Sequence, residues 1–432
     1  MSTAKSAEPK IFARRESEAR SYCRAFDTVF TKACNATMID AEGREYTDFL
    51  AGCSSLNYGH NDPDMKTALI EHIAGDGIAH GLDMFTDTKQ AFLETFESLI
   101  LEPRGLPHKL MMTGPTGTNA VEAALKLARK VTGRTEVVAF TNGFHGMTLG
   151  ALAATGNQGK RGGAGGIILP GVTRMPYEDA LGEGADPLDF LETMLDNPSS
   201  GIEAPAAFLI ELIQGEGGLT AASPAFVRRL ASIAKAHGSL LIVDDIQAGI
   251  GRCGSFFSFE EMGVEPDMVT LAKSFSGFGL PFAGLLLRPE HDIWKPAEHN
   301  GTFRGNTHAF VTARIALEKF WADGQFQAEI AEKSALLTER LGRIAGMIPG
   351  AKLKGRGMMQ GVDVGGGELA GAICAECFAN GLIIETSGAH DEVVKVLAPL
   401  TIPRAQFEAG LDTLEAAARH CAPTNNTSIA AE

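Results

Sequence analysis

Short apolar runs alternate with amphipathic segments between about residues 110 and 330 of the chain. The runs are bounded by polar or Gly-rich stretches, as buried strands are, and the segments between them repeat apolar residues at helical spacing. The predicted strands are Glu136–Thr141, Phe208–Ile213, Ser239–Asp244, Met268–Ala272 and Phe282–Leu287, and the predicted helices are Ala120–Thr132, Pro224–Ala236 and His308–Trp321. Because continuous apolar strands are typical of sheets covered on both faces, the pattern predicts an α/β fold with a mostly parallel sheet.

The two ends of the chain show a different pattern. Residues 30–50 predict a small β-ribbon with Ala41–Gly43 at its turn, and a long helix is expected from about residue 335. Strands are expected near 359–364, 382–386 and 393–396, and helices near 369–380 and 404–420. We therefore expect an N-terminal segment at 1–60 that joins a smaller α+β domain at 331–422, a large domain at 61–330, and a disordered tail at 423–432.

Length and charge limit the classes of function. A chain of 432 residues with 44% apolar and 21% charged residues can form more than one lobe around a sizeable core. Its 53 acidic residues exceed the 38 basic ones, and the net charge of −15 argues against nucleic acid or an anionic membrane as a partner. No apolar run approaches the roughly 18 residues of a membrane span, and no secretory signal is evident at the start.

Seven cysteines are spread along the chain, an odd number that does not suggest a disulfide framework. Cys374 and Cys377 form a C-x-x-C pair, but they fall in a predicted helix with no second pair nearby, so a metal or redox role is disfavoured. This cysteine usage is typical of a reduced protein, and we expect a cytoplasmic one without a metal site.

Parallel sheets bind ligands at the carboxyl ends of their strands, so the residues that follow each predicted strand are the candidates for binding and catalysis. Thr113–Asn119 is a Gly-rich turn that leads into the helix at Ala120. Free backbone N–H groups and the positive end of the helix dipole make such a turn an anion site, to which Thr116 and Thr118 add hydroxyl donors. The alternative is simple capping of the helix by Thr118 or Asn119.

Two further strand ends carry charged residues. Asp244, followed by Asp245, ends the apolar run Leu240–Val243, and a buried carboxylate is costly unless a cation or a proton faces it. Its alternative role is a helix cap or a place in a surface loop. Lys273 follows the strand Met268–Ala272, where desolvation would depress its pKa and make the amine nucleophilic. A lysine that only extends its amine to solvent is the alternative.

A phosphate-binding turn, a strand-end acid and a strand-end lysine are together the parts of a pyridoxal phosphate site. Lys273 would bind the aldehyde, Asp244 would keep the pyridine nitrogen protonated, and the turn would hold the phosphate. Phe144, just after the strand at 136–141, supplies an aromatic ring that could stack on the cofactor. Gly249–Gly254 matches G-x-G-x-x-G, but it does not follow the strand directly and opens no evident helix, so NAD binding is disfavoured.

Five motifs follow one another along the chain: Thr116-Gly-Thr-Asn-Ala-Val-Glu-Ala-Ala, Gly143-Phe-His-Gly, Ile213-Gln-Gly-Glu-Gly-Gly, Val243-Asp-Asp-Ile-Gln-Ala-Gly and Leu271-Ala-Lys-Ser. In this order they resemble the class III, ω-type aminotransferases of pyridoxal phosphate fold type I, over about residues 30–420. Longer stretches that begin at Phe12, Phe140 and His299 resemble the diaminobutyrate–2-oxoglutarate aminotransferases of ectoine synthesis.

The resemblance implies transfer of an amino group between L-2,4-diaminobutyrate and 2-oxoglutarate, with pyridoxal 5′-phosphate as cofactor. Glutamate would be the donor and aspartate 4-semialdehyde the acceptor, in the first committed step of ectoine biosynthesis. The resemblance also implies a homodimer, or a dimer of dimers, with active sites at the subunit interface. The alternatives are a different amine such as ornithine or 4-aminobutyrate, and a scaffold that binds a ligand without catalysis.

The resemblance assigns roles to single residues as well. Lys273 would be the Schiff-base lysine and proton shuttle, and Asp244 the partner of the pyridine nitrogen. Further cofactor contacts are implied for Gly117, Thr118 and Asn119 at the phosphate, Phe144 and Ile246 on the two ring faces, Gln247 at the ring hydroxyl, His145, and Thr302 at the phosphate of the neighbouring subunit.

Substrate contacts are implied for Glu216, Lys395 and Asn57. In related enzymes the acid at the position of Glu216 pairs with an Arg and acts as a gate between two kinds of substrate. Here the Arg-x-x-Pro-Pro-Leu of the class is replaced by Lys395-Val-Leu-Ala-Pro-Leu, and lysine offers a point charge in place of a planar fork. The group that binds the glutamate α-carboxylate is therefore open, with Arg14, Arg15 and Arg304 as candidates.

Overall fold

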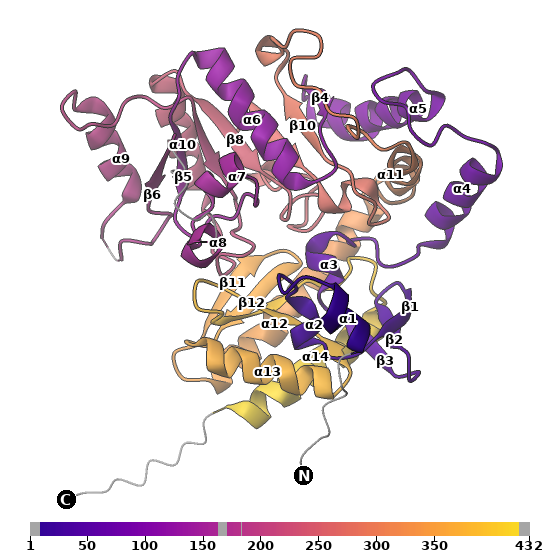
Figure 1. Cartoon of the computed structure of the whole chain (residues 1–432). Coiled ribbons are helices and arrows are strands. Elements are labelled where there is room, and N and C mark those ends of the chain that lie inside the picture. The colour runs from indigo at the N-terminus through magenta and orange to yellow at the C-terminus, as the bar shows by residue number, and fades with distance from the viewer. Residues whose placement is uncertain (1–8, 163–170, 183, 423–432) are drawn as a thin grey trace, which may run out of the picture.

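The computed structural model describes residues 9–162, 171–182 and 184–422. The predicted disordered tail at 423–432 lies outside these residues. The described chain forms a large lobe around one wide sheet and a smaller lobe that contains the C-terminal elements together with the first strands of the chain (Figure 1). The exact domain boundaries at 60 and 330 stay predictions.

A seven-stranded sheet with the order β4-β10-β9-β8-β7-β5-β6 forms the centre of the large lobe. Its strands are β4 (Lys109–Met112), β5 (Val137–Phe140), β6 (Val172–Met175), β7 (Ala207–Ile210), β8 (Leu240–Asp244), β9 (Met268–Leu271) and β10 (Gly284–Leu287). β10 runs antiparallel to both neighbours, and the pairs from β9 to β6 are parallel, so the predicted mostly parallel sheet is confirmed. The sequence analysis did not predict β4 and β6, the partly exposed edge strands.

The central strands are buried on both faces, and their side chains alternate between two apolar clusters. Val137, Leu209 and Ile242 lie in the cluster with α6 (Gly117–Thr132) and α7 (Leu149–Ala154). The residues next to them in each strand lie in the larger cluster, which includes α10 (Pro224–Ala236), α5 (Asp87–Phe96) and α11 (Thr307–Phe320). Coverage of both faces explains why these strands are continuous apolar runs.

The smaller lobe contains two four-stranded sheets. One has the order β1 (Phe30–Cys34), β2 (Thr37–Asp40), β3 (Glu45–Asp48) and β13 (Leu382–Ile383), so the N-terminal ribbon pairs with a C-terminal strand. The other has the order β11 (Lys352–Arg356), β12 (Met359–Asp363), β15 (Val393–Val396) and β14 (Glu385–Ser387). The single strand predicted near 382–386 was wrong: the segment divides at Ile384 and contributes one strand to each sheet.

Helices of the smaller lobe are α12 (Gln325–Met347), α13 (Gly367–Ala379) and α14 (Arg404–Cys421). α12 begins ten residues before the predicted start at 335, because its first turns bury Phe326 and Ile330 in the core. The remaining helices before the large sheet are α1 (Lys10–Arg15), α2 (Tyr22–Ala25), α3 (Ala51–Ser54) and α4 (Pro63–Ala74), and α8 (Gln158–Gly162) and α9 (Pro187–Asp196) lie beside the sheet.

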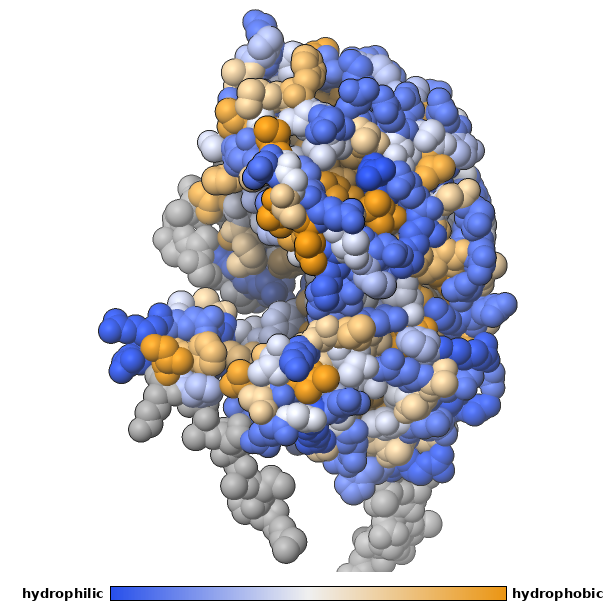
Figure 2. All heavy atoms as spheres, turned by 90° about the vertical axis from the view of Figure 1, so that its right-hand side faces the viewer, coloured by the Kyte–Doolittle hydropathy of each residue, from blue (hydrophilic) through white to orange (hydrophobic). Residues whose placement is uncertain are grey.

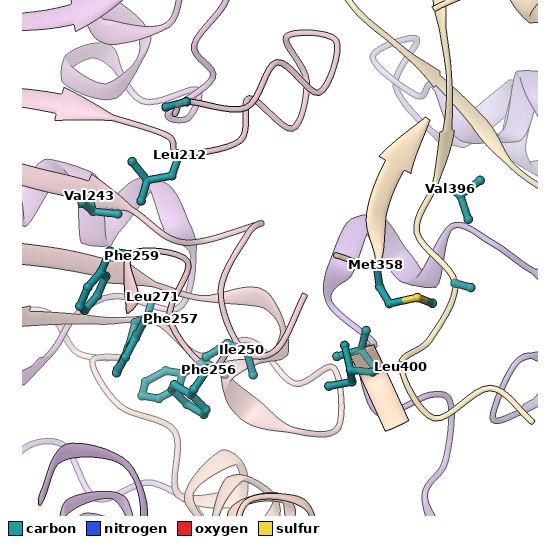
Figure 3. Close-up of a cluster of buried hydrophobic side chains, with 14 of the residues drawn as sticks. Leu212, Val243, Ile250, Phe256, Phe257, Phe259, Leu271, Met358, Val396 and Leu400 are labelled. Carbon is teal, nitrogen blue, oxygen red and sulfur yellow. The ribbon is translucent and has the colours of Figure 1, made fainter. Parts of the chain in front are cut away.

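One apolar core joins the two lobes. Val243 and Leu271 at the strand ends, the aromatic segment Phe256–Phe259, and Met358 and Leu400 of the smaller lobe belong to the same cluster (Figure 3). Arg252 is fully buried within this region and donates to Asn57 Oδ1 at 2.6 Å and to the carbonyl oxygen of Ala398 at 2.7 Å. The lobes are therefore linked by a satisfied buried cation as well as by apolar contact.

The G-x-G-x-x-G and C-x-x-C motifs, for which NAD and metal binding were disfavoured, lie in a turn region and on a helix. Gly249–Gly254 forms turns and leads into no helix. Cys374 and Cys377 lie on α13, where burial raises the pKa of the Cys377 thiol to about 12. Within the described ranges no helix has the length and apolarity to cross a membrane.

Candidate active site

Strand ends of the large sheet and the start of α6 surround a cavity of about 510 Å³. It is lined by nine residues for which the sequence analysis implied roles: Gly117, Thr118, Phe144, His145, Glu216, Asp244, Ile246, Gln247 and Lys273. They come from segments far apart in the sequence, and the parallel strands bring them to one edge of the sheet. The cavity thus lies at the carboxyl ends of the strands, where a ligand site was predicted.

Asp244 ends β8 with its carboxylate buried and paired. One oxygen, Oδ2, lies 2.7 Å from His145 Nδ1, and the other, Oδ1, accepts the Thr270 hydroxyl at 2.9 Å. Burial lowers the pKa of His145, but the hydrogen bond and charge of Asp244 outweigh it, so the pKa is raised from its usual value. A protonated His145 places a positive charge beside the buried carboxylate of Asp244.

Lys273 lies where β9 ends, in a strained backbone conformation. Its φ of 53° is in the left-handed region, which a lysine seldom adopts. The amine forms no hydrogen bond or ion pair with any residue that the structure describes, and burial lowers its pKa. A larger share of neutral amine near physiological pH makes Lys273 a nucleophile that faces the cavity.

The turn before α6 has the features of an anion site. Gly117 begins the helix beside Ile246, and a Cβ at this glycine would lie 2.8 Å from Ile246 Cδ1, so any larger residue would displace that side chain. Thr118 Oγ1 lies 2.7 Å from Thr148 Oγ1 at the same end of the cavity. Asn119 Oδ1 instead accepts the Thr116 backbone N–H at 3.2 Å, so this amide caps the helix.

Gln247 and Glu216 lie on the other side of Lys273. Gln247 Nε2 donates to Glu216 Oε1 at 3.3 Å, while Gln247 Oε1 is buried with no hydrogen-bond partner in the described chain. Lys395, which is 0% exposed, places its amine 3.1 Å from Glu216 Oε1. Burial raises the pKa of Glu216, but Lys395 opposes this more strongly and the pKa is lowered to about 2. The unpaired amide oxygen is a free acceptor for a ligand hydroxyl.

Five other residues for which the sequence suggested contacts lie elsewhere. Asn57 is buried in the link between the lobes, where its amide donates to the Ile250 carbonyl and accepts from Arg252, and it does not line the cavity. Thr302 lies in an exposed turn of the chain, outside this cavity. Arg14 and Arg15 are exposed on α1, and Arg304 donates to the His299 carbonyl.

Two acids at the site were not recognised from the sequence. Glu211 lines the cavity and accepts the backbone N–H of Phe144 at 2.6 Å and of Gly215 at 3.0 Å, which fixes two cavity loops against each other. Its burial raises its pKa to about 7. A carboxylate inside the apolar run Phe208–Ile213 was the signal that could have found it. Glu385, the second partner of Lys395, gave no such signal.

The neighbouring acids Asp244 and Asp245 face different surroundings. Asp244 lines the cavity, whereas Asp245 is fully buried away from it and accepts the Ser258 backbone N–H at 3.1 Å. Burial with few partners raises the pKa of Asp245 to about 7. Of the two carboxylates, only Asp244 can reach a ligand in the cavity.

Comparison with known proteins identifies the family and its relatives. The model of the family described as Aminotransferase class-III matches residues 18–418. The diaminobutyrate–2-oxoglutarate transaminase of Halomonas elongata is 52% identical over 412 residues, covering 94% of this chain and 98% of that protein. The protein of the same name from Vibrio cholerae is 56% identical, with the same coverage of 94% and 98%. Among solved structures, the ornithine aminotransferase of Toxoplasma gondii superposes with a TM-score of 0.82 at 26% identity, covering 95% of this chain and 93% of that one.

The buried Asp245 generates a pH-dependent prediction. Because its folded pKa of about 7 exceeds the unfolded value near 4, the folded state holds a proton that the unfolded state releases, and stability falls as pH rises between the two values. Asp245→Asn removes this loss. We expect its free energy of unfolding to match the wild type near pH 4 and to exceed it by about 4 kcal/mol at pH 8. Urea unfolding at both pH values measures the difference, and an equal difference at the two would contradict the assignment.

Proposed function

The chain belongs to the class III aminotransferases, and we propose that it transfers an amino group between L-2,4-diaminobutyrate and 2-oxoglutarate. In the synthetic direction glutamate donates the amino group and the aldehyde carbon of aspartate 4-semialdehyde accepts it, the first committed step of ectoine biosynthesis. The observation that carries the proposal is identity of 52% and 56% to two proteins of that activity over 94% of the chain. Ornithine is the substrate named for a structure at only 26% identity.

The cavity fits pyridoxal 5′-phosphate as the cofactor. The Lys273 amine has no partner in the described chain, Gln247 Oε1 is an unpaired buried acceptor, and the turn at Gly117 leads into a helix N-terminus. Lys273 would hold the aldehyde carbon, Gln247 the ring hydroxyl, and Gly117 and Thr118 the phosphate. When bound, the cofactor supplies an electron-withdrawing ring that stabilises negative charge at the amino acid Cα.

Lys273 carries the proton transfers of the reaction. Its lowered pKa gives a neutral amine that would remove the proton from the substrate Cα and deliver it to the carbon that takes up the amino group. His145 and Thr270 fix the orientation of the Asp244 carboxylate, which would hold a proton on the ring nitrogen of the bound cofactor. Phe144 and Ile246 line the cavity and would pack against the ring and exclude water from the reacting atoms.

Class III aminotransferases act on small molecules and are typically oligomers, and we propose a homodimer as the smallest active unit of this chain. A group of exposed apolar side chains on α4, α5 and the segments beside them supports it: Ile70, Ile73, Ile78, Leu82, Met84, Phe85, Leu93 and Phe303. Phe85 is 100% exposed, and Figure 2 shows apolar side chains gathered on the face that contains α4 and α5. Such a surface is typical of a subunit interface.

Thr302 lies next to Phe303 at this apolar face. A second subunit seated on the face would meet the exposed turn, and we propose that Thr302 contacts the phosphate of the neighbouring subunit from there, the role implied for it by the resemblance. The seven cysteines are all free thiols, which supports a reducing compartment, and we place the reaction in the cytoplasm.

The function is tested by the purified wild-type protein with three amines. We expect diaminobutyrate with 2-oxoglutarate to yield glutamate with a kcat/KM at least about tenfold above that with ornithine or 4-aminobutyrate. Lys273→Ala should form no detectable glutamate, since among the described residues no other lysine lines the cavity to hold the aldehyde or move the proton.

Lys235→Ala, which removes an exposed lysine at the end of α10, is the matched control and should keep full activity. Normal turnover of Lys273→Ala would refute the role of that amine. A preference for ornithine or 4-aminobutyrate would refute the proposed substrate but not the class of reaction.

Asp244→Asn tests the support of the ring nitrogen. The amide keeps the size of the side chain but cannot hold a proton on the nitrogen, so we expect kcat to fall by about 100-fold or more. The midpoint of thermal unfolding should change little, because the variant retains hydrogen-bonding atoms toward His145 and Thr270. Steady-state kinetics and thermal melting measure the two effects, and activity within twofold of the wild type would contradict the role.

Phe85→Asp tests the dimer. A charge at this position of the apolar face should dissociate the subunits, since a buried unpaired carboxylate is costly at an interface. Light scattering should give at least twice the 45.6 kDa chain mass for the wild type and a single chain mass for the variant, with loss of activity. Phe190→Asp on α9, which is exposed outside this face, should remain an active oligomer. A monomeric wild type with full activity would exclude the dimer.

A further inference from the structure

Lys395 lies between two carboxylates. Its amine is 3.1 Å from Glu216 Oε1 and 2.8 Å from Glu385 Oε1, and the lysine is 0% exposed. Burial lowers the pKa of Lys395, but the two acids outweigh it and raise the pKa above its usual value, so the lysine stays charged. Two carboxylates and one ammonium (−2 and +1) leave a net charge of −1 in the group.

The two acids are held in different ways. Glu385 on β14 lies directly opposite Lys395 on β15 in the antiparallel register, so the sheet itself fixes this ion pair. Glu216 lies in the loop after β7, where it also accepts a hydrogen bond from Gln247. Glu385 is therefore the partner of Lys395 that the strand pairing fixes, and Glu216 is the partner that lines the cavity.

The surplus negative charge acts on the reacting amine. Burial and the charge of Lys395 lower the pKa of Lys273, while Glu216 and Glu385 raise it, so all three charged side chains are close enough to act electrostatically on its Nζ. Glu385 Oε1 also lies 3.8 Å from Cys53 Sγ, and the Cys53 carbonyl accepts from Gln247 at 3.4 Å. Glu385 itself does not line the cavity, and Cys53 lies between it and the cavity-lining Gln247.

We propose that Glu385 determines the charge preference of the site, favouring a diamine over a dicarboxylate substrate. The inference rests on the proposed function, in which the two amino donors differ in charge. Diaminobutyrate has two ammonium groups and one carboxylate at neutral pH, whereas glutamate has one ammonium group and two carboxylates. Lys395 has one positive charge between the two carboxylates, so the charge of Glu385 leaves the group with a surplus negative charge, which attracts the first substrate and repels the second.

Glu385→Gln in the holoenzyme tests this role. The amide retains the shape of the side chain and can still accept from Lys395, which keeps Glu216 as its ion pair, so the fold should be preserved. We expect the KM for diaminobutyrate to rise and the KM for glutamate to fall, each by about three- to tenfold, with kcat little changed. The two half-reactions are followed separately through the visible absorption of the cofactor.

Opposite shifts in the two KM values distinguish electrostatic selection from general damage to the site. General damage would weaken the binding of both substrates and raise both KM values. Glu385→Asp retains the charge and should keep the wild-type ratio of the two KM values. Glu368→Gln makes the same charge change at an exposed position on α13 and should also leave the ratio unchanged.

An unchanged ratio in Glu385→Gln, or a rise in both KM values, would overturn the inference. A wild-type protein that reacts with neither amine would instead refute the proposed function. The two failures are therefore separate results of one set of measurements.

Discussion

The cost of burying charge is the constraint on which this site depends. Asp244 is paired with His145, and Lys395 lies between Glu216 and Glu385. Arg252 between the lobes is satisfied by Asn57 and main-chain carbonyls. Lys273 alone among these groups has neither a hydrogen bond nor an ion pair in the described chain. Each of the surrounding ions has hydrogen-bond or ion-pair partners, so the one amine without a partner is left to react with a ligand.

The sequence predicted the large lobe well because its signals are local. Buried central strands are continuous apolar runs, and Pro224–Ala236 begins and ends at the predicted residues. Edge strands such as Val172–Met175 lack this signal, since partial exposure admits Arg174 into the strand. The division of the chain at Ile384 between two sheets could not be predicted, because it depends on which distant strands offer a free edge.

The candidate site shows the same contrast. Asp244 and Lys273 stand directly at strand ends, so their place at the cavity follows from the topology of a parallel sheet. Nothing in the sequence around Asn57 indicates that its amide binds Arg252. That contact forms only because residues 250–252 fold beside it. Glu385 looks in the sequence like an ordinary acid in a short strand. Only the cross-strand register brings it to Lys395.

The pairing of β3 with β13 has a consequence for biosynthesis. Thr47 lies opposite Leu382, so a ribbon that leaves the ribosome early has no partner until nearly all of the chain has been made. Contacts between such distant segments close late and slow the search for the native state. During translation the ribbon exposes a free strand edge, which is a target for chaperones or for pairing with another nascent chain.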